Sequence, residues 1–239
     1  MVELGRIDIA TEVSMLAAYS AAPRQGHLAA INHLFAYLEK NPRSKLVFDP
    51  SNMDHEPQER PDWSDFYSPQ EEVIPSDMPE PRGKALQITV FVDSDHAGDV
   101  VNRRSRTGVL IFCGRSPIVF HTKKQTSIES SSFGSELSAM KTAVELTEGL
   151  RYKLRMMGVP LDGPAFVKAD NMSVVHNCSN PASMLKKKSN SIAYHYVRER
   201  CAGGVCNITY VSTDLNVADM LTKSQPGEVR KRLAEMVLY

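Results

Sequence analysis

The sequence predicts an α/β fold with a five-stranded mixed sheet flanked by helices and preceded by a small helical segment. Three runs rich in β-branched and aromatic residues, near 86–94, 107–113 and 118–121, are separated by turns and predict an antiparallel meander. A helical pattern over 131–157 separates this meander from a fourth run at 164–169. A strand that returns to a sheet after a helix usually lies parallel to its neighbour, so the sheet is expected to be mixed.

Residues 1–48 are expected to be helical. Apolar residues recur at helical spacing at Ile31, Leu34, Phe35 and Leu38, and a shorter helix is expected before Pro23. Two such helices are too small to bury their own apolar stripes. We therefore expect them to pack on another part of the protein.

Residues 49–84 are rich in proline and acidic residues and predict an extended linker. Residues 49–80 hold ten acids and one base, whereas the remainder of the chain carries 27 bases and 18 acids. A basic body is typical of a protein that binds a phosphate backbone, although an ordinary mixed surface gives the same average. The split raises the hypothesis that the linker masks the basic face. Trp63, Phe66 and Tyr67 are suited to pin the linker to a neighbouring surface.

Residues 85–239 are expected to form one domain. After the fourth strand we expect helices near 171–178 and 190–202, a strand at 207–211, a short helix at 216–223 and a helical tail from Gly227. No run of 18 apolar residues occurs, so no membrane span is expected. The four cysteines show no paired spacing, which fits free thiols in a reducing compartment.

Four acids stand near the ends of four predicted elements. Asp93 ends the first strand, Glu136 lies near the start of the long helix, Asp170 ends the fourth strand and Asp219 opens the last short helix. A carboxylate at the end of a buried strand is costly unless a cation or a donor meets it. Carboxylates are the hard ligands that Mg²⁺ prefers, and a pair of ions held by them can support phosphodiester hydrolysis.

Each acid also has a purely structural interpretation. Asp93 and Asp95 could begin a polar turn, and Glu136 could favour the helix dipole. Asp170 and Asn171 could form a strand-end turn with a helix N-cap, and Asp219 could belong to a capping arrangement. The order of elements that supplies all four acids carries the argument for a metal site.

Seven short motifs carry a resemblance to a known family. They are residues 92–99 (VDSDHAGD), 103–108 (RRSRTG), 123–125 (KKQ), 132–137 (SFGSEL), 169–171 (ADN), 194–199 (YHYVRE) and 218–223 (ADMLTK). In this combination and order, residues 86–225 closely resemble the ribonuclease H domain at the C-terminal end of copia-type LTR-retrotransposon polyproteins. Residues 6–48 resemble the last helices of the preceding reverse transcriptase, so 1–48 is expected to be a remnant of its thumb or connection.

The resemblance implies a ribonuclease H: hydrolysis of the RNA strand of RNA–DNA hybrids with two Mg²⁺ or Mn²⁺ ions, within a retrotransposon polyprotein. Carried over residue by residue, it assigns the catalytic and metal-binding carboxylates to Asp93, Glu136, Asp170 and Asp219. Many relatives have an acid where this chain has Gly134, which leaves Glu136 as the only candidate on that turn.

Asp95 remains a rival or a helper of Asp93. The alternative function is a catalytically inactive or domesticated nucleic-acid-binding or structural remnant. The expected partners are the hybrid and the rest of the reverse transcriptase polyprotein, with no membrane. The expected location is intracellular: cytoplasmic, in a retroelement particle, or nuclear.

Hybrid binding requires bases and small donors along one face. The candidates are Arg103, Arg104 and Arg106 in the first hairpin, Lys123, Lys124 and Gln125 after the third strand, Lys186, Lys187 and Lys188 in a later loop, and Asn171 beside Asp170. A solvated basic surface is the alternative interpretation of each cluster.

Overall fold

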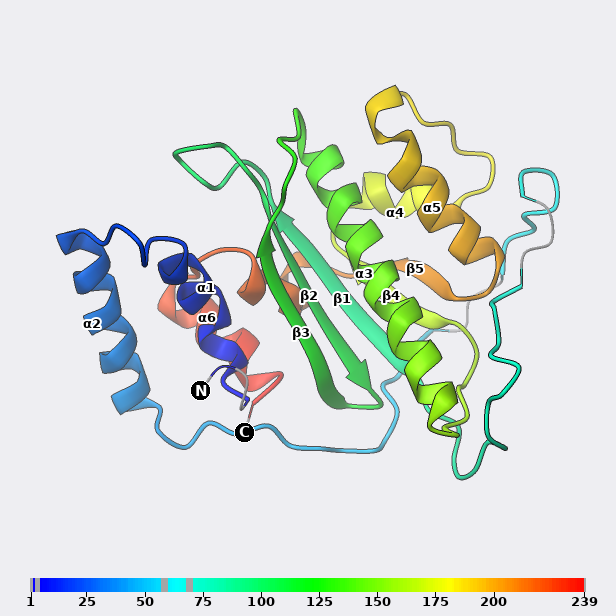
Figure 1. Cartoon of the computed structure of the whole chain (residues 1–239), viewed down its shortest axis with the longest axis horizontal. Coiled ribbons are helices and arrows are strands. Elements are labelled where there is room, and N and C mark those ends of the chain that lie inside the picture. Colours follow the sequence, from blue (N-terminus) through cyan, green and yellow to red (C-terminus); the bar gives the residue numbers. More distant parts are fainter. Residues whose placement is uncertain (1, 3–4, 57–59, 68–70, 239) are drawn as a thin grey trace.

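A computed structural model describes residues 2, 5–56, 60–67 and 71–238, so residues 57–59 and 68–70 of the predicted linker lie outside the described residues. Its centre is a five-stranded sheet in the order β3-β2-β1-β4-β5 (Figure 1). The strands are β1 (Ile88–Asp95), β2 (Arg106–Cys113), β3 (Ser116–Lys124), β4 (Ala165–Ala169) and β5 (Cys206–Tyr210). The first three pair antiparallel, and β4 is parallel to both β1 and β5. The predicted α/β fold with a mixed sheet is confirmed.

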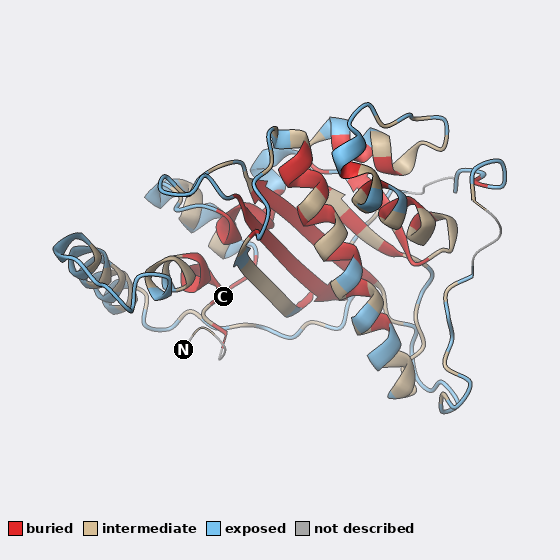
Figure 2. Ribbon diagram, turned by 45° about the horizontal axis from the view of Figure 1, so that its top comes forward, coloured by how far each residue is buried: buried red, intermediate tan, exposed pale blue. Residues whose placement is uncertain are grey.

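Helices cover both faces of the sheet. On one face lie α3 (Ser132–Met156), α4 (Met172–Ser179) and α5 (Ser191–Ala202), which share a core with the inward residues of β1 and β2. The other face carries α1 (Ala10–Ala17), the short 3-10 helix η5 (Val217–Leu221) and α6 (Gly227–Glu235). The central strands are therefore buried on both sides (Figure 2). This burial explains why β1 and β2 read as continuous apolar runs.

Two strands end later in the sequence than predicted. β3 runs from Ser116 to Lys124, and β1 continues beyond Asp93 as far as Asp95 because β2 pairs with it to the end. Asp93 therefore lies inside the strand, opposite Gly108. A Cβ atom at Gly108 would lie 2.7 Å from Thr222 Cγ2 and 2.8 Å from the Ala218 carbonyl oxygen. The missing side chain lets η5 and the residues after it approach the sheet beside Asp93.

The N-terminal segment packs only in part. Ile7 and Ala10 are buried against the sheet face that α6 also covers. By contrast α2 (Gln25–Lys40) contains no buried residue, and Leu28 and Phe35 remain 59% and 63% exposed. The expected packing holds for the residues around α1, whereas α2 contacts the rest of the protein through half-buried residues such as Tyr37, whose hydroxyl donates to Asp8 Oδ2 at 2.8 Å.

The predicted linker is a strap fixed to the domain. Trp63 is buried in the main core, and Tyr67 packs beside it, whereas Phe66 is 54% exposed. Further along, both carboxylate oxygens of Glu72 accept hydrogen bonds at 2.7 Å from the Arg151 guanidinium.

The ion pairs of the strap do not support the masking hypothesis. Among the described residues its acids pair with Arg115, Arg151 and Arg155, and none of these belongs to the predicted nucleic-acid-binding clusters. Within the part of the chain that the structure describes, no helix has both the length and the apolar character needed to cross a membrane.

Candidate active site

Three of the four predicted carboxylates meet at one edge of the sheet. Asp93 comes from β1, Asp170 follows β4 and Glu136 lies on the second turn of α3. Because β1 and β4 are parallel neighbours, with Phe91 beside Lys168, their carboxyl ends place Asp93 and Asp170 side by side. One carboxylate oxygen from each of the three residues lies within 4.8 Å of the others. Ser131 caps α3 by accepting the Gly134 N–H at 3.3 Å, which fixes where the helix begins.

The three carboxylates form a site of unbalanced negative charge. Asp93 is only 4% exposed and Glu136 only 9%. Burial raises the pKa of the Glu136 carboxyl, and repulsion by Asp93 and Asp170 raises it further. Burial also raises the pKa of Asp93, while the hydrogen bond from Thr222 lowers it. Among the described residues none of the three forms an ion pair, so the arrangement suits a divalent cation with hard oxygen ligands.

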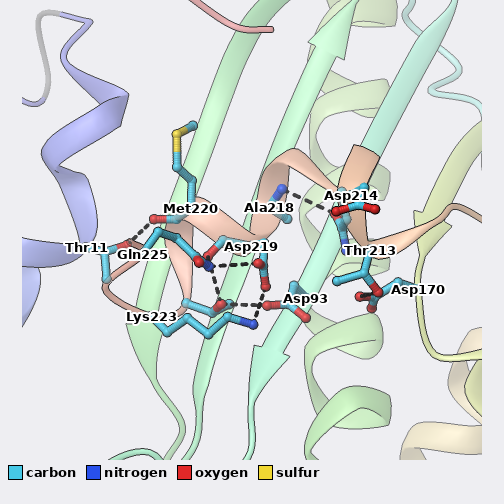
Figure 3. A network of polar contacts seen from close by, with 12 residues as sticks. Thr11, Asp93, Asp170, Thr213, Asp214, Ala218, Asp219, Met220, Lys223 and Gln225 are labelled. Atoms are coloured by element: carbon cyan, nitrogen blue, oxygen red, sulfur yellow. Dashed lines mark hydrogen bonds and ion pairs between the residues drawn. The ribbon is translucent and has the colours of Figure 1, made fainter. Parts of the chain in front are cut away.

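Asp219 lies beside this cluster and is engaged by other groups (Figure 3). Its Oδ1 atom is 2.5 Å from Lys223 Nζ, and its Oδ2 atom accepts a 2.7 Å hydrogen bond from Gln225 Nε2. The link to Asp93 runs through Thr222, whose hydroxyl donates to Asp93 Oδ2 at 2.5 Å. The structure thus brings Asp93, Glu136 and Asp170 together, with Asp219 on the neighbouring helix η5.

The surroundings of Asp170 orient its side chain. Thr213 Oγ1 donates to Asp170 Oδ2 at 2.8 Å. Asn171 caps α4, because its side-chain oxygen accepts the backbone N–H groups of Ser173 at 3.1 Å and Val174 at 3.2 Å. The N-cap interpretation of Asn171 is therefore confirmed, and its oxygen is already used inside the protein.

Asp95 has a structural position. Its Oδ1 atom accepts the Gly98 backbone N–H at 2.8 Å, and it is not one of the clustered carboxylates. A Cβ atom at Gly98 would lie 1.8 Å from Asp95 Oδ2, so the turn requires glycine there. The polar-turn interpretation applies to Asp95 and not to Asp93.

Two of the predicted nucleic-acid contacts are buried. Arg106 is 6% exposed and donates to Ser14 Oγ at 2.7 Å, because α1 lies over it. Gln125 is 8% exposed and donates from Nε2 to Ser135 O at 2.9 Å. Both side chains are engaged inside the protein in this structure, and a contact of either one with nucleic acid stays a prediction.

The other predicted basic residues lie at or near the surface. Arg103, Arg104, Lys123, Lys186, Lys187 and Lys188 are exposed, and Lys124 is partly exposed. Lys187 donates to Ser131 Oγ at 2.6 Å at the start of α3, and Lys124 pairs with Asp99. These residues remain candidates for contact with nucleic acid.

Sequence reasoning missed four polar residues around the carboxylates. They are Thr213, Thr222, Lys223 and Gln225. A signal existed for two of them, because Thr222 and Lys223 belong to the motif of residues 218–223 and Lys223 follows Asp219 at the helical i, i+4 spacing. Thr213 and Gln225 had no such signal, since their roles depend on how η5 docks.

Solved structures with low sequence identity align with parts of the chain. RNase H1 from the halophilic archaeon Halobacterium salinarum NRC-1 is 14% identical, with a TM-score of 0.45 over 57% of this chain and 94% of that chain. LC11-RNase H1 in complex with an RNA/DNA hybrid is 16% identical, with a TM-score of 0.46 over 57% of this chain and 94% of its own. No family model matches the chain.

Curated relatives are found among transposon polyproteins. The retrovirus-related Pol polyprotein from transposon RE1 of Arabidopsis thaliana is 24% identical over 91% of this chain and 13% of its own length. The corresponding polyprotein from transposon TNT 1-94 of Nicotiana tabacum is 29% identical over 62% of this chain and 11% of its own length. The chain therefore spans only a small part of each relative. The predicted recognition is confirmed in these terms: the chain is similar, over most of its length, to one segment of the retrovirus-related Pol polyproteins of plant transposons.

Proposed function

We propose that this chain hydrolyses the RNA strand of RNA–DNA hybrids, with two Mg²⁺ or Mn²⁺ ions held by Asp93, Glu136, Asp170 and Asp219. The observation that carries the proposal is the cluster of three carboxylates, two of them buried, in which one oxygen from each residue lies within 4.8 Å of the others. Such a cluster is costly to bury without a cation. The similarity to retrotransposon Pol polyproteins supports nucleic acid as the substrate.

The bound ions would supply an activated water and neutralise the charge that develops on the leaving oxygen. The chain contributes the carboxylate ligands and holds them in position. Thr222 fixes one oxygen of Asp93, and Thr213 fixes one oxygen of Asp170, which leaves the other oxygen of each for a ligand role. Second contacts of this kind orient metal ligands and tune their basicity.

The exposed bases provide a surface for the hybrid. Arg103 and Arg104 lie in the β1–β2 turn, and the three lysines at 186–188 precede α5. Phosphate and sugar contacts from such residues do not read bases, so we expect binding that tolerates sequence and weakens with salt. In the full polyprotein, the remaining segments would make additional contacts with the hybrid.

The test is cleavage of a hybrid with labelled RNA in Mg²⁺ by the unmodified chain and by Asp170→Asn. The matched control is Asp162→Asn, which changes an exposed acid just before β4. We expect cutting that requires Mg²⁺, survives in the control and is lost in Asp170→Asn. Tight hybrid binding without cutting by the unmodified chain would instead favour the non-catalytic remnant.

A further inference from the structure

Lys223 is a cation built into the edge of the carboxylate site. Its ammonium nitrogen lies 2.5 Å from Asp219 Oδ1, and its side chain reaches from the segment after η5 toward Asp93 and Asp219 (Figure 3). The Asp219 side chain is only 8% exposed, whereas that of Lys223 is 48% exposed. A buried carboxylate is thus met by a lysine that retains access to water.

Within the described part of the chain, the Lys223 ammonium alone satisfies this oxygen. Asp219 Oδ1 is buried and has no hydrogen-bond partner among the described residues apart from its ion pair with Lys223. The other oxygen, Oδ2, is fixed by Gln225 Nε2 at 2.7 Å. Asp219 is therefore held by two side chains that both follow it in sequence, and it is not among the clustered carboxylates.

The flexible side chain of Lys223 allows its ammonium group to be replaced by another cation at Asp219. Lys223 hangs on a flexible stem and is half exposed, so it can leave Asp219 without unfolding its surroundings. Asp93, by contrast, keeps its own donor, the Thr222 hydroxyl, when the lysine moves. A divalent ion and an ammonium cannot both sit against Asp219 Oδ1, because like charges at such distances repel by several kcal/mol.

We infer that Lys223 is an internal competitor for the second divalent ion: it neutralises Asp219 and must withdraw before that oxygen can ligate a metal. This inference rests on the proposed two-ion site and adds a control on how that site fills. Lys223 acts through Asp219 and is a positioning residue. The first ion, held by Asp93, Glu136 and Asp170, binds without this exchange.

The experiment is calorimetric titration of the full chain with Mn²⁺, together with thermal unfolding in EDTA and in Mn²⁺. The variants are Lys223→Met, which removes the charge, and Lys223→Arg, which keeps it. Lys231→Met is the matched control, because it removes an exposed lysine of the same C-terminal segment. In Lys223→Met we expect the second Mn²⁺ to bind at least about tenfold more tightly while the first is unchanged.

The unfolding data supply a second readout. Lys223→Met should unfold at a lower temperature than the unmodified chain in EDTA, because Asp219 loses its cation, and Mn²⁺ should stabilise it by more. Lys223→Arg and Lys231→Met should behave like the unmodified chain. Equal or weaker second-ion affinity in Lys223→Met would overturn the inference and leave the proposed function intact.

Two further outcomes separate the claims. No Mn²⁺ binding by any form would overturn both the metal site and the inference. Two bound ions with the expected shift in Lys223→Met, but no cleavage of any hybrid, would uphold the role of Lys223 and refute the proposed function.

Discussion

Replacing Glu136 by glutamine should stabilise the protein in the absence of divalent ions. One carboxylate oxygen from each of Asp93, Glu136 and Asp170 lies within 4.8 Å of the others, and no ion pair among the described residues offsets their charge. At that distance two unit charges repel by about 3 kcal/mol when the effective dielectric constant is about 20. Part of this repulsion is relieved by protonation, so we expect a gain of about 2 kcal/mol, or roughly 4–8 °C in Tm.

The gain should depend on pH. Burial and repulsion raise the folded-state pKa of Glu136 above its ordinary value of 4.5. A carboxyl whose pKa is raised on folding favours the folded protein below its unfolded-state pKa, and this advantage is lost as the pH rises through the folded-state pKa. The difference between Glu136→Gln and the unmodified chain should therefore be small near about pH 5 and large near about pH 9.

The assay is thermal unfolding followed by circular dichroism, in EDTA and in Mg²⁺. Glu145→Gln serves as the control, because this acid lies on the same helix with its side chain 44% exposed. Mg²⁺ should stabilise the unmodified chain and the control, but should stabilise Glu136→Gln much less. If Glu136→Gln has an unchanged or lower Tm in EDTA at high pH, the cluster is not a site of unbalanced charge and our reasoning fails.

Three further predictions concern the strap, the buried arginine and η5. Burial acts to raise the pKa of Glu72, but hydrogen bonds from two arginines lower it to about 2. The stability that the ionised Glu72 contributes is therefore present above about pH 4.5 and lost toward about pH 2. Glu72→Gln should lower the free energy of unfolding in urea by about 2 kcal/mol at pH 7 and leave it unchanged near about pH 2. Arg198→Met should cost about 3 kcal/mol in the same assay, because Arg198 is 2% exposed and donates to three backbone carbonyls, one in α4 and two in the loop that follows it. A cost below about 1 kcal/mol would contradict this role. Gly108→Ala should lower hybrid cleavage more than 10-fold, in a rate measurement at saturating Mg²⁺, by pushing Thr222 and η5 from Asp93, and an unchanged rate would show that η5 need not be close.

Arg198 gives a physical reason for the motif at residues 194–199. Its guanidinium lies 4.9 Å from the centroid of the Trp63 ring and 4.7 Å from that of Tyr194, and it donates to the Asn180 carbonyl at 2.7 Å. One buried side chain therefore joins the strap, α5 and the loop that carries the lysines at 186–188. The motif is structural at this position, although the sequence alone offers no means to distinguish a structural arginine from a ligand-binding one.

The strands and helices were predictable because apolar periodicity is local, and so was the approach of Asp93 to Asp170, because parallel neighbours present their carboxyl ends at one edge. The burial of Arg106 under α1 was not predictable, because it depends on contact between segments about 90 residues apart.

By itself, the sequence determined the α/β class, the order of the elements and the set of acids that could serve a metal. Only the tertiary structure decided which acids share a site, that Asp95 closes a turn, and that Lys223 neutralises Asp219. The physical reason is the distance along the sequence over which each effect acts. Backbone propensity and apolar periodicity act over a few residues, whereas the environment of a charge is set by whichever distant segments pack around it.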